Sequence, residues 1–391
     1  MEELYEHYAT SLPAAANAES RRRLCGELEA TEIEWSDPEA LETKLCIKSF
    51  GLTLQNLHKW LLATPSSTCI QHDASETGTC MARIVLCNKE LKRPWQASPA
   101  ALRVVEHFDM RLAYEYARTC VSGTGKLFSR GNTTTYMLAH SKLVALWSVT
   151  RSPSPSPSPV TATVTIQAIM FASPGERARL QGLVAKPWNP SLTFHDMFPG
   201  LLCGLALSQE VDSVQEDINE AMRHVEVRTG HHNSLRGREE EPAPGSWGHL
   251  SAKMSGFARK LASTNRKIMV ASELLGFITA NSGSDSFSEL SSSSSSPLEE
   301  QTETDKKEKG EKDDEEKRKW KGNQLTGNHV RLISARLDMQ RVQNDFLVQK
   351  VNIQLTAVCL FLFLSHFTLA VSLYLSIFPI KKTPLTAADL N

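Results

Sequence analysis

The sequence predicts an α+β protein in which an α/β head domain is followed by long antiparallel helices, a coiled-coil-like stalk and one C-terminal transmembrane helix. Short β-prone apolar runs are confined to about the first 173 residues. Longer segments after this point carry apolar residues at helical spacing. Near the end of the chain, residues 356–380 contain no formal charge. These three observations predict the order head, helices and membrane segment.

The head domain is predicted to cover residues 1–173. Its strongest strand candidates are Ala82–Cys87, Thr134–Val149 and Val160–Phe171, which are apolar and β-prone. Between the last two, residues 152–159 alternate serine and proline, which favours an extended, solvated loop. The runs on either side of this loop are therefore expected to pair as a β-hairpin.

One helix is expected inside the head, from Ser98 to about Cys120. Ser98 can cap such a helix, and Pro99 suits its first turn. Apolar side chains then recur at helical spacing, at Leu102, Val105, Phe108, Leu112 and Tyr116. The pattern predicts a single amphipathic helix.

Residues 174–280 are predicted to form a helical hairpin. The first long helix lies within 194–228 and has one apolar stripe, formed by Leu207, Val211, Val214, Ile218, Met222 and Val225. The second lies within 247–280 and supplies apolar side chains for an antiparallel neighbour, at Leu250, Met254, Phe257, Leu261, Ile268, Met269 and Leu275.

Residues 281–322 are predicted to be a disordered insertion. A serine tract at 291–296 leads into a block of mixed charge, and almost no apolar residue occurs there before Trp320. Such a composition buries too little apolar surface to offset the loss of chain entropy. A docking or phosphorylation role for the charged block is the alternative to a solvated insertion.

A stalk helix is predicted at 323–355. Apolar residues recur there every seven positions, at Leu332, Met339, Phe346 and Ile353, with an offset second row at Ala335 and Val342. Heptad spacing of this kind is typical of coiled coils. The stalk is expected to continue directly into the membrane segment.

The transmembrane helix is predicted at 356–380, before Lys381, Lys382 and the rest of a short tail at 381–391. About 25 helical residues extend close to 40 Å, enough to cross a hydrocarbon core of roughly 30 Å with some tilt. A buried helix of a soluble domain is the alternative, but such helices are usually shorter and carry a polar face. Because no signal-peptide pattern precedes the head, we expect a single-pass protein in the lipid bilayer with most of the chain in the cytosol.

Composition excludes some classes of function. Lys and Arg number 43 against 44 Asp and Glu, so the basic excess usual for a nucleic-acid-binding protein is missing and we expect no nucleic-acid partner. The eight cysteines form no CxxC pair and are typical of reduced, mostly buried thiols. Sequence spacing brings out no catalytic Ser/His/Asp or Cys/His set, so we expect neither an enzyme nor an organic cofactor.

The helical part of the chain resembles a known family of membrane transporters. The segments SAKMSGFARKLASTNRK at 251–267, ELLGFI at 273–278 and RLDMQRVQNDFLVQKVNIQLTAV at 336–358 look like the divergent fungal CorA-like divalent cation transporters. The resemblance extends from about 194 to 380 and is only general over the head. It implies a homopentamer in which the stalk enters the first of two membrane helices around a pore for Mg²⁺ or a related metal ion.

The chain departs from this family where the first span ends. Members carry a Gly-Met-Asn signature there, whereas this sequence has Leu375–Pro379 and no second apolar run. Since hydrated Mg²⁺ gives up water reluctantly, a selective mouth needs polar oxygens in fixed rings. The resemblance therefore implies a degenerate transporter or an accessory subunit that associates with complete family members, unless the gene model is truncated. The alternative is a non-conducting tail-anchored adaptor or scaffold.

Two sets of residues are candidates for a site. Ser365, Thr368, Ser372 and Ser376 share one helix face and would form rings of hydroxyls around an axis, or alternatively bond to their own helix carbonyls and help helices pack. The acids of the first long helix are candidates for a regulatory Mg²⁺ site, or alternatively form a solvated face, at Glu210, Asp212, Glu216 and Asp217.

Overall fold

The computed structural model describes residues 28–36, 45–62, 78–89, 97–120, 122–152, 163–193, 195–229, 246–282 and 303–377. These residues belong to two compact units. The first unit comprises Met1–Val211 and Lys267–Met339, and the second comprises Asp212–Arg266 and Gln340–Asn391. The three long helices α8 (Phe198–Thr229), α9 (Ser246–Ser282) and α10 (Glu303–Ile377) each contribute residues to both units.

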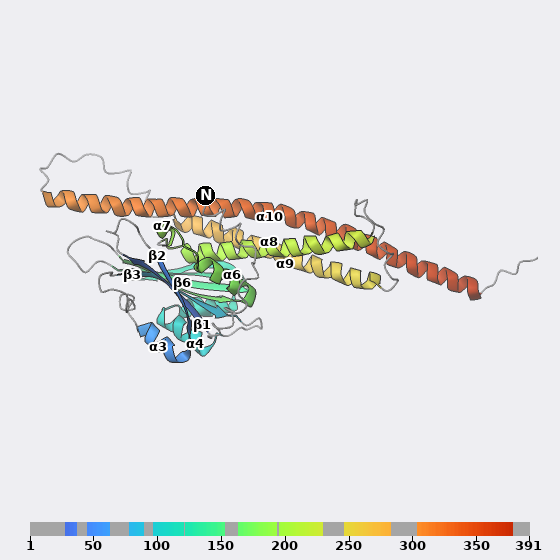
Figure 1. Ribbon diagram of the computed structural model, residues 1–391, viewed down its shortest axis with the longest axis horizontal. Helices are drawn as coiled ribbons and strands as arrows, with labels where there is room; N and C mark the ends of the chain where they lie inside the picture. Colours follow the sequence, from blue (N-terminus) through green and yellow to red (C-terminus); the bar gives the residue numbers. More distant parts are fainter. Residues whose placement is uncertain are drawn as a thin grey trace, which may run out of the picture. The chain divides into compact units, whose positions relative to one another are not determined.

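A seven-stranded mixed sheet forms the centre of the first unit (Figure 1). Its strands are β1 (Leu28–Ser36), β2 (Leu45–Leu52), β3 (Gly78–Asn88), β4 (Gly123–Arg130), β5 (Thr133–Ala139), β6 (Leu143–Ser152) and β7 (Thr163–Ala172). Their order across the sheet is β2-β1-β3-β7-β6-β5-β4. Only the central β3–β7 pair is parallel, and the other neighbours run antiparallel.

Helices cover both faces of this sheet. One face packs on α3 (Leu54–Leu62), α4 (Pro99–His107) and α5 (Arg111–Thr119). The other packs on α6 (Pro174–Val184), α7 (Pro190–Thr193) and the parts of α8, α9 and α10 that belong to the first unit. Side chains along β6 alternate between the two cores, with Trp147 on the α8 side and Leu146 on the α4 side. The predicted head, residues 1–173, therefore supplies the sheet and the helices on one face, and the helices on the other face come from later residues.

The predicted hairpin is confirmed, since β6 and β7 pair antiparallel from Ser152↔Thr163 to Leu143↔Ala172. The proline-rich residues between them, 153–159, lie outside the described residues. The apolar run that the sequence suggested as one strand is instead two strands, β5 and β6. They turn at Ser141 and Lys142, where His140 and Leu143 exchange backbone hydrogen bonds of 2.8 and 3.2 Å. A two-residue turn without glycine, proline or asparagine leaves little signal in a sequence.

The single helix expected at 98–120 is wrong, because the structure divides it into α4 and α5. Ser98 caps α4 as predicted, and its Oγ accepts the N–H of Ala101 at 3.3 Å. The chain then breaks at Asp109, whose φ of 53° lies in the left-handed region. The break changes which side of α5 faces the core. Leu112 and Tyr116 are exposed, and the buried residues of α5 are Ala113, Tyr114 and Ala117.

The second unit is a bundle of helix segments. The parts of α8, α9 and α10 in this unit share one apolar core, which contains Ile218, Met222, Val225, Leu250, Met254, Phe257, Leu261, Leu347, Val351 and Val358. An ion pair of 3.0 Å between Lys350 and Glu226 joins α10 to α8 at its edge. Most of the apolar positions predicted for α8 and α9 are buried, but Met269 is exposed.

Part of the predicted disordered segment is helical, because α10 begins at Glu303 rather than at 323. Residues 283–302 lie outside the described residues. The helical part is rich in Lys and Glu, which have high helix propensity and can form favourable pairs three or four positions apart. A composition that cannot build a core can therefore still extend a helix that is packed further along.

The heptad row predicted for the stalk is not the row of α10 that packs within the chain. The buried row, called here the inner seam, alternates steps of three and four residues and consists of Gln340, Asn344, Leu347, Val351, Gln354 and Val358. The predicted positions Met339, Val342, Phe346 and Ile353 are instead between 54% and 75% exposed, and they are called here the outer stripe. Polar residues obscured the inner seam in the sequence. Gln340, for example, is buried because its backbone oxygen accepts from Gln215 Nε2 at 2.7 Å and its side chain donates to Asp212.

Candidate functional site

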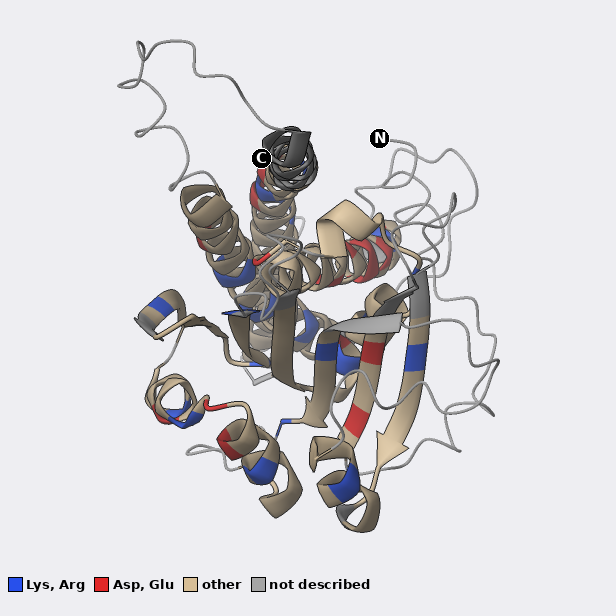
Figure 2. Ribbon diagram, turned by 90° about the vertical axis from the view of Figure 1, so that its left-hand side faces the viewer, with Lys and Arg blue, Asp and Glu red and all other residues tan. Residues whose placement is uncertain are grey.

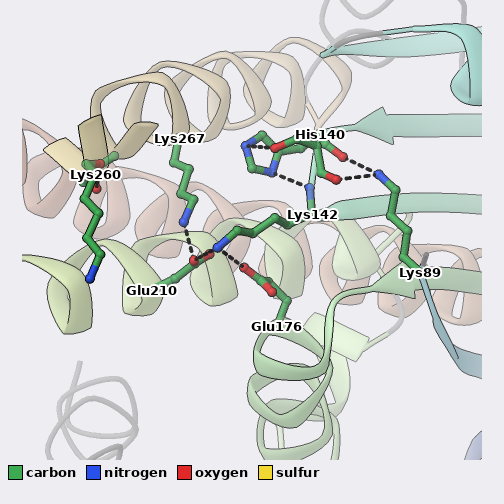
Figure 3. A network of polar contacts seen from close by, with 9 residues as sticks. Lys89, His140, Lys142, Glu176, Glu210, Lys260 and Lys267 are labelled. Atoms are coloured by element: carbon green, nitrogen blue, oxygen red, sulfur yellow. Dashed lines mark hydrogen bonds and ion pairs between the residues drawn. The ribbon is translucent and has the colours of Figure 1, made fainter. Parts of the chain in front are cut away.

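A buried cluster of charged side chains lies in the first unit, where the β5–β6 turn meets α6, α8 and α9 (Figure 3). Lys142 extends from the turn, and Glu176 lies in the first turn of α6. Glu210 lies on α8 and Lys267 on α9. These four residues are called here the turn network. Four segments far apart in the sequence thus supply two acids and two lysines to one place.

The geometry of the turn network centres on Glu210. Its Oε1 atom lies 3.1 Å from the Nζ atom of Lys142 and also accepts a hydrogen bond from Lys267. Glu176 lies further away, with 3.9 Å between its Oε1 atom and Lys142 Nζ. The side chain of Glu176 is only 2% exposed, whereas that of Lys142 is 42% exposed. Lys142 therefore connects a buried pair of carboxyl groups to solvent.

A third lysine, Lys89, fixes the turn that carries Lys142. Lys89 Nζ donates to the backbone oxygens of His140 and Ser141 at 2.8 and 2.9 Å. The backbone N–H of Lys142 donates a hydrogen bond to Nδ1 of His140, with 3.4 Å between the two nitrogen atoms. Burial and the positive charge of Lys267 lower the pKa of His140 to about 4. The imidazole is therefore neutral at physiological pH and acts as an acceptor inside the turn.

The two glutamates of the turn network differ in protonation. Burial, followed by a hydrogen bond with Glu210, raises the pKa of Glu176 to about 7. Burial also opposes ionisation of Glu210, but hydrogen bonds from Glu176 and Lys267 outweigh it and lower the pKa of Glu210 to about 2. Oε1 of Glu176 and Oε2 of Glu210 are buried without a donor when both groups are ionised. A proton held by Glu176 supplies a hydrogen bond between the two carboxyl groups.

The turn network can therefore bind and release one proton close to neutral pH. Its lysines already occupy the carboxylate that ionises most readily, and within the described ranges no three His, Cys, Asp or Glu side chains lie close enough together to hold a metal ion. Breaking a buried charge pair is costly, because the remaining charge stays without compensation. The arrangement is suited to holding α8 and α9 against the β5–β6 turn in a proton-dependent way.

Charged residues also occur inside the strands themselves (Figure 2). On β1 and β3, Glu32 and Arg83 form a fully buried ion pair with an Nε–Oε1 distance of 3.1 Å. Trp60 of α3 donates its indole N–H to the same carboxylate at 2.8 Å, and the Arg83 guanidinium lies 5.1 Å from the Trp60 ring centre. This pair holds α3 on the sheet face opposite the turn network. On the same side of the sheet, burial and then the positive charge of Arg83 lower the pKa of His107.

The acids predicted on α8 divide into buried and exposed residues. Glu216 and Asp217 are exposed, as expected for a solvated face. Asp212 accepts a hydrogen bond from Gln340. Glu210, in contrast, is buried in the turn network. A sequence signal for this did exist, because Glu210 directly precedes Val211 and follows Leu207 by three positions, on the apolar side of the helix.

The hydroxyl residues predicted in the membrane segment lie on exposed positions of α10. Ser365 Oγ donates to the backbone oxygen of Leu362 at 2.8 Å, and Thr368 Oγ1 donates to that of Ser365 at 2.9 Å. Ser376 makes the same kind of bond to Leu373 at 2.8 Å. Ser372 is exposed on the same face. Three of the four hydroxyls thus make the local bonds that were the expected alternative to pore lining.

The face that these hydroxyls occupy can be followed along α10. Ser365 and Ser372 come seven and fourteen residues after the fully buried Val358, so they continue the inner seam. The outer stripe continues instead through Leu360 and Phe367, seven and fourteen residues after Ile353. The hydroxyl face and the outer stripe therefore lie on opposite sides of the same helix.

The apolar end of α10 is the membrane candidate in the described chain. Within Lys321–Ser376, one apolar window is long enough to cross a membrane, and only 6% of it is buried. A core helix of a soluble protein would be mostly covered by other residues. Comparison with models of known protein families found no match for the chain, and a search of curated proteins found no similar sequence.

Proposed function

We propose that this protein is a membrane-anchored, accessory subunit of a divalent cation transport assembly of the CorA-like type. The end of α10 anchors it in the lipid bilayer, and the outer stripe binds the corresponding helix of other subunits, which are copies of this chain or complete relatives. Mg²⁺ or a related ion would be the cargo of the assembly. The observation that carries the proposal is the exposed heptad row on a helix that continues into the apolar segment.

The outer stripe has the properties of a helix contact surface. Met339, Val342, Phe346 and Ile353 are large apolar side chains on one face, and each is more than half exposed. Burying such a side chain contributes about 1.5–3 kcal/mol relative to leaving it in water. Copies anchored in one membrane with the same orientation have parallel α10 helices, which is the arrangement that heptad rows favour. The inner seam is already covered within the chain, so the outer stripe is the face available for assembly.

The accessory role follows from the residues that continue the outer stripe into the membrane segment. Its continuation consists of Leu360, Phe363 and Phe367, which offer no oxygen to a cation. A Mg²⁺ path needs polar oxygens, because the ion loses its water reluctantly. The hydroxyl residues point away from this stripe. Subunits that meet through the outer stripe would therefore form an apolar axis, and the polar mouth would come from another subunit.

Cysteine crosslinking in membranes tests the assembly step. In a Cys359→Ser background, Ile353→Cys places a thiol on the outer stripe, and Asn352→Cys places one about 100° away on the same turn. Both native side chains are exposed, so neither change disturbs the core. We expect disulfide-linked subunits for Ile353→Cys and none for Asn352→Cys. Equal crosslinking of both variants, or of neither, would contradict assembly through the outer stripe.

The transport step is tested on complexes purified from native membranes and reconstituted into liposomes. We expect Mg²⁺ uptake by the native complex, and reduced uptake when Phe346→Ser weakens assembly. The apolar continuation of the outer stripe also favours a second function, a non-conducting anchored adaptor. A complex that assembles through the outer stripe but passes no Mg²⁺ would support the adaptor and exclude the transport role.

A further inference from the structure

The beginning of α9 packs on the beginning of the apolar segment of α10, and both belong to the second unit. The rings of Trp247 and Phe361 stack with their centres 4.7 Å apart and their planes 17° from parallel. Trp247 is only half-buried, and the next two residues, Gly248 and His249, are exposed. One side of the indole therefore contacts the membrane helix, and the other remains accessible.

Contacts between α10 and the rest of the described chain end close to this stacking pair. Val358 is fully buried in the core of the second unit, and Leu362 still packs against that core. From Phe363 to Ser376 every described residue is exposed. Helix α10 is therefore covered by other residues before the position that Trp247 contacts, and it is apolar and uncovered after that position.

We infer that Trp247 lies at the membrane–water interface and that the first turn of α9 contacts the headgroup region of the bilayer. This inference rests on the proposed membrane anchoring by α10. Tryptophan is enriched at such interfaces because its ring is apolar and its N–H seeks a polar partner. Among the described residues no group accepts the indole N–H of Trp247, so headgroup oxygens and interfacial water are its partners.

Helix length supports this position of the interface. The apolar run begins at 356, but residues up to Val358 are partly covered by the second unit and need no lipid. Counting from Phe361 to Ile377, where α10 ends, gives about 17 residues, which extend roughly 25 Å and lie at the lower end of the range of lengths that cross a bilayer. The span thus starts near Phe361, and the run before it belongs to the packed bundle.

Fluorescence quenching by brominated lipids tests the inference on the full chain in liposomes. Bromine near the headgroups should quench part of the tryptophan emission of the wild-type protein, and bromine near the chain ends should quench less. The variant Trp247→Phe keeps a ring on Phe361 and should lose this quenchable part. Three of the other tryptophans, Trp60, Trp147 and Trp188, are buried in the first unit and provide an unquenched background.

A second variant separates this inference from the anchoring on which it rests. Leu369→Trp in the Trp247→Phe background places an indole within the span, at an exposed position on the side away from the outer stripe, where bromine near the chain ends should quench it. If no lipid quenches this introduced indole, membrane anchoring itself fails. If the introduced indole is quenched but Trp247 of the wild type is not, anchoring stands and the interfacial contact of α9 is overturned. Quenching of Trp247 by deep rather than shallow bromine would also overturn it.

Discussion

Lys267 of α9 donates a hydrogen bond to Glu210 of α8, and both side chains are only 4% exposed. The pair is not isolated, because the same Glu210 oxygen lies 3.1 Å from Lys142 in the β5–β6 turn. Two helices and one sheet turn therefore meet at a single carboxylate. In a region with so little solvent, the loss of Lys267 removes the buried cation of this carboxylate and leaves only the partly exposed Lys142 to compensate its charge.

Replacing Lys267 by methionine should therefore destabilise the first unit by about 3–5 kcal/mol, the range for breaking a buried charge pair. Methionine keeps most of the length and the apolar stem, so the effect reports the missing charge. Urea unfolding of the full chain in detergent, followed by circular dichroism, measures the change. The matched control is Lys260→Met, two helical turns earlier on α9, where the side chain is exposed and the change should stay within about 0.5 kcal/mol. Similar losses for both lysines would contradict the role of the turn network.

Glu176→Gln should change how stability depends on pH. Because the folded pKa of about 7 exceeds the ordinary value of 4.5, the folded protein binds the proton more tightly than the unfolded chain. The contribution of Glu176 to the free energy of unfolding is fully present below pH 4.5, the ordinary pKa. It is lost as the pH rises through about 7, the pKa in the folded protein. Linkage gives a slope of about 1.4 kcal/mol per pH unit between these two values and none above them.

The measurement is the free energy of unfolding of wild type and Glu176→Gln from about pH 5 to about pH 8. The advantage of the wild type over the variant should shrink up to about pH 7 and then stay constant. His140 also titrates in this range with opposite sign, because its lowered pKa favours the folded state only when the imidazole is neutral. His140 is present in both proteins, so the difference between them isolates Glu176. A difference that is independent of pH would show that Glu176 does not hold the proton.

Two glycines of α10 should respond in opposite directions to alanine. A Cβ atom at Gly322 would lie 2.7 Å from the backbone oxygen of Ser191, whereas one at Gly327 would meet no atom within 4 Å. Gly322→Ala must push α10 away from α7 and should cost about 1–3 kcal/mol. Gly327→Ala should stabilise the helix by about 0.5–1 kcal/mol, because alanine loses less backbone entropy. Thermal unfolding of both variants checks this, and a stabilising Gly322→Ala would show that α10 does not approach Ser191 closely.

The sequence predicts the architecture well where apolar spacing is unambiguous. The β6–β7 hairpin, the long helices α8 and α9 and the apolar end of α10 all have patterns set by residues that can only be buried or inserted in lipid. It fails where a local backbone feature decides, as at Asp109, whose left-handed conformation breaks a continuous helical pattern. Nothing in the side chains around Asp109 indicates this break.

The turn network and the inner seam were missed for a common reason. Hydropathy treats Glu210, Lys267, Gln340 and Asn344 as surface residues, but all four are buried. For the first three, other elements supply partners for the polar groups. Such partners come from positions far apart in the chain, so spacing within one helix does not reveal them. Asn344 is buried with its Oδ1 lacking a donor, and nothing in the described residues explains that position.

The last prediction concerns the hydroxyl residues of the membrane segment. If assembly uses the outer stripe, the double variant Ser365→Ala, Ser372→Ala should leave the oligomeric state unchanged. Ser365 bonds to its own helix, so its loss should change stability by no more than about 0.5 kcal/mol. Phe363→Ser, on the continuation of the outer stripe, should in contrast weaken assembly.

Native mass measurement in mild detergent and crosslinking through Ile353→Cys should report the same difference between these two variants. The outcome shows which face of α10 lies at the axis of the assembly, because the hydroxyl face and the outer stripe are on opposite sides of the helix. Fewer subunits in the serine double variant, with Phe363→Ser unaffected, would place the hydroxyl face at the axis. Assembly would then occur on the side of the inner seam, and a polar path for Mg²⁺ along Ser365, Thr368 and Ser372 would become the better account of this helix.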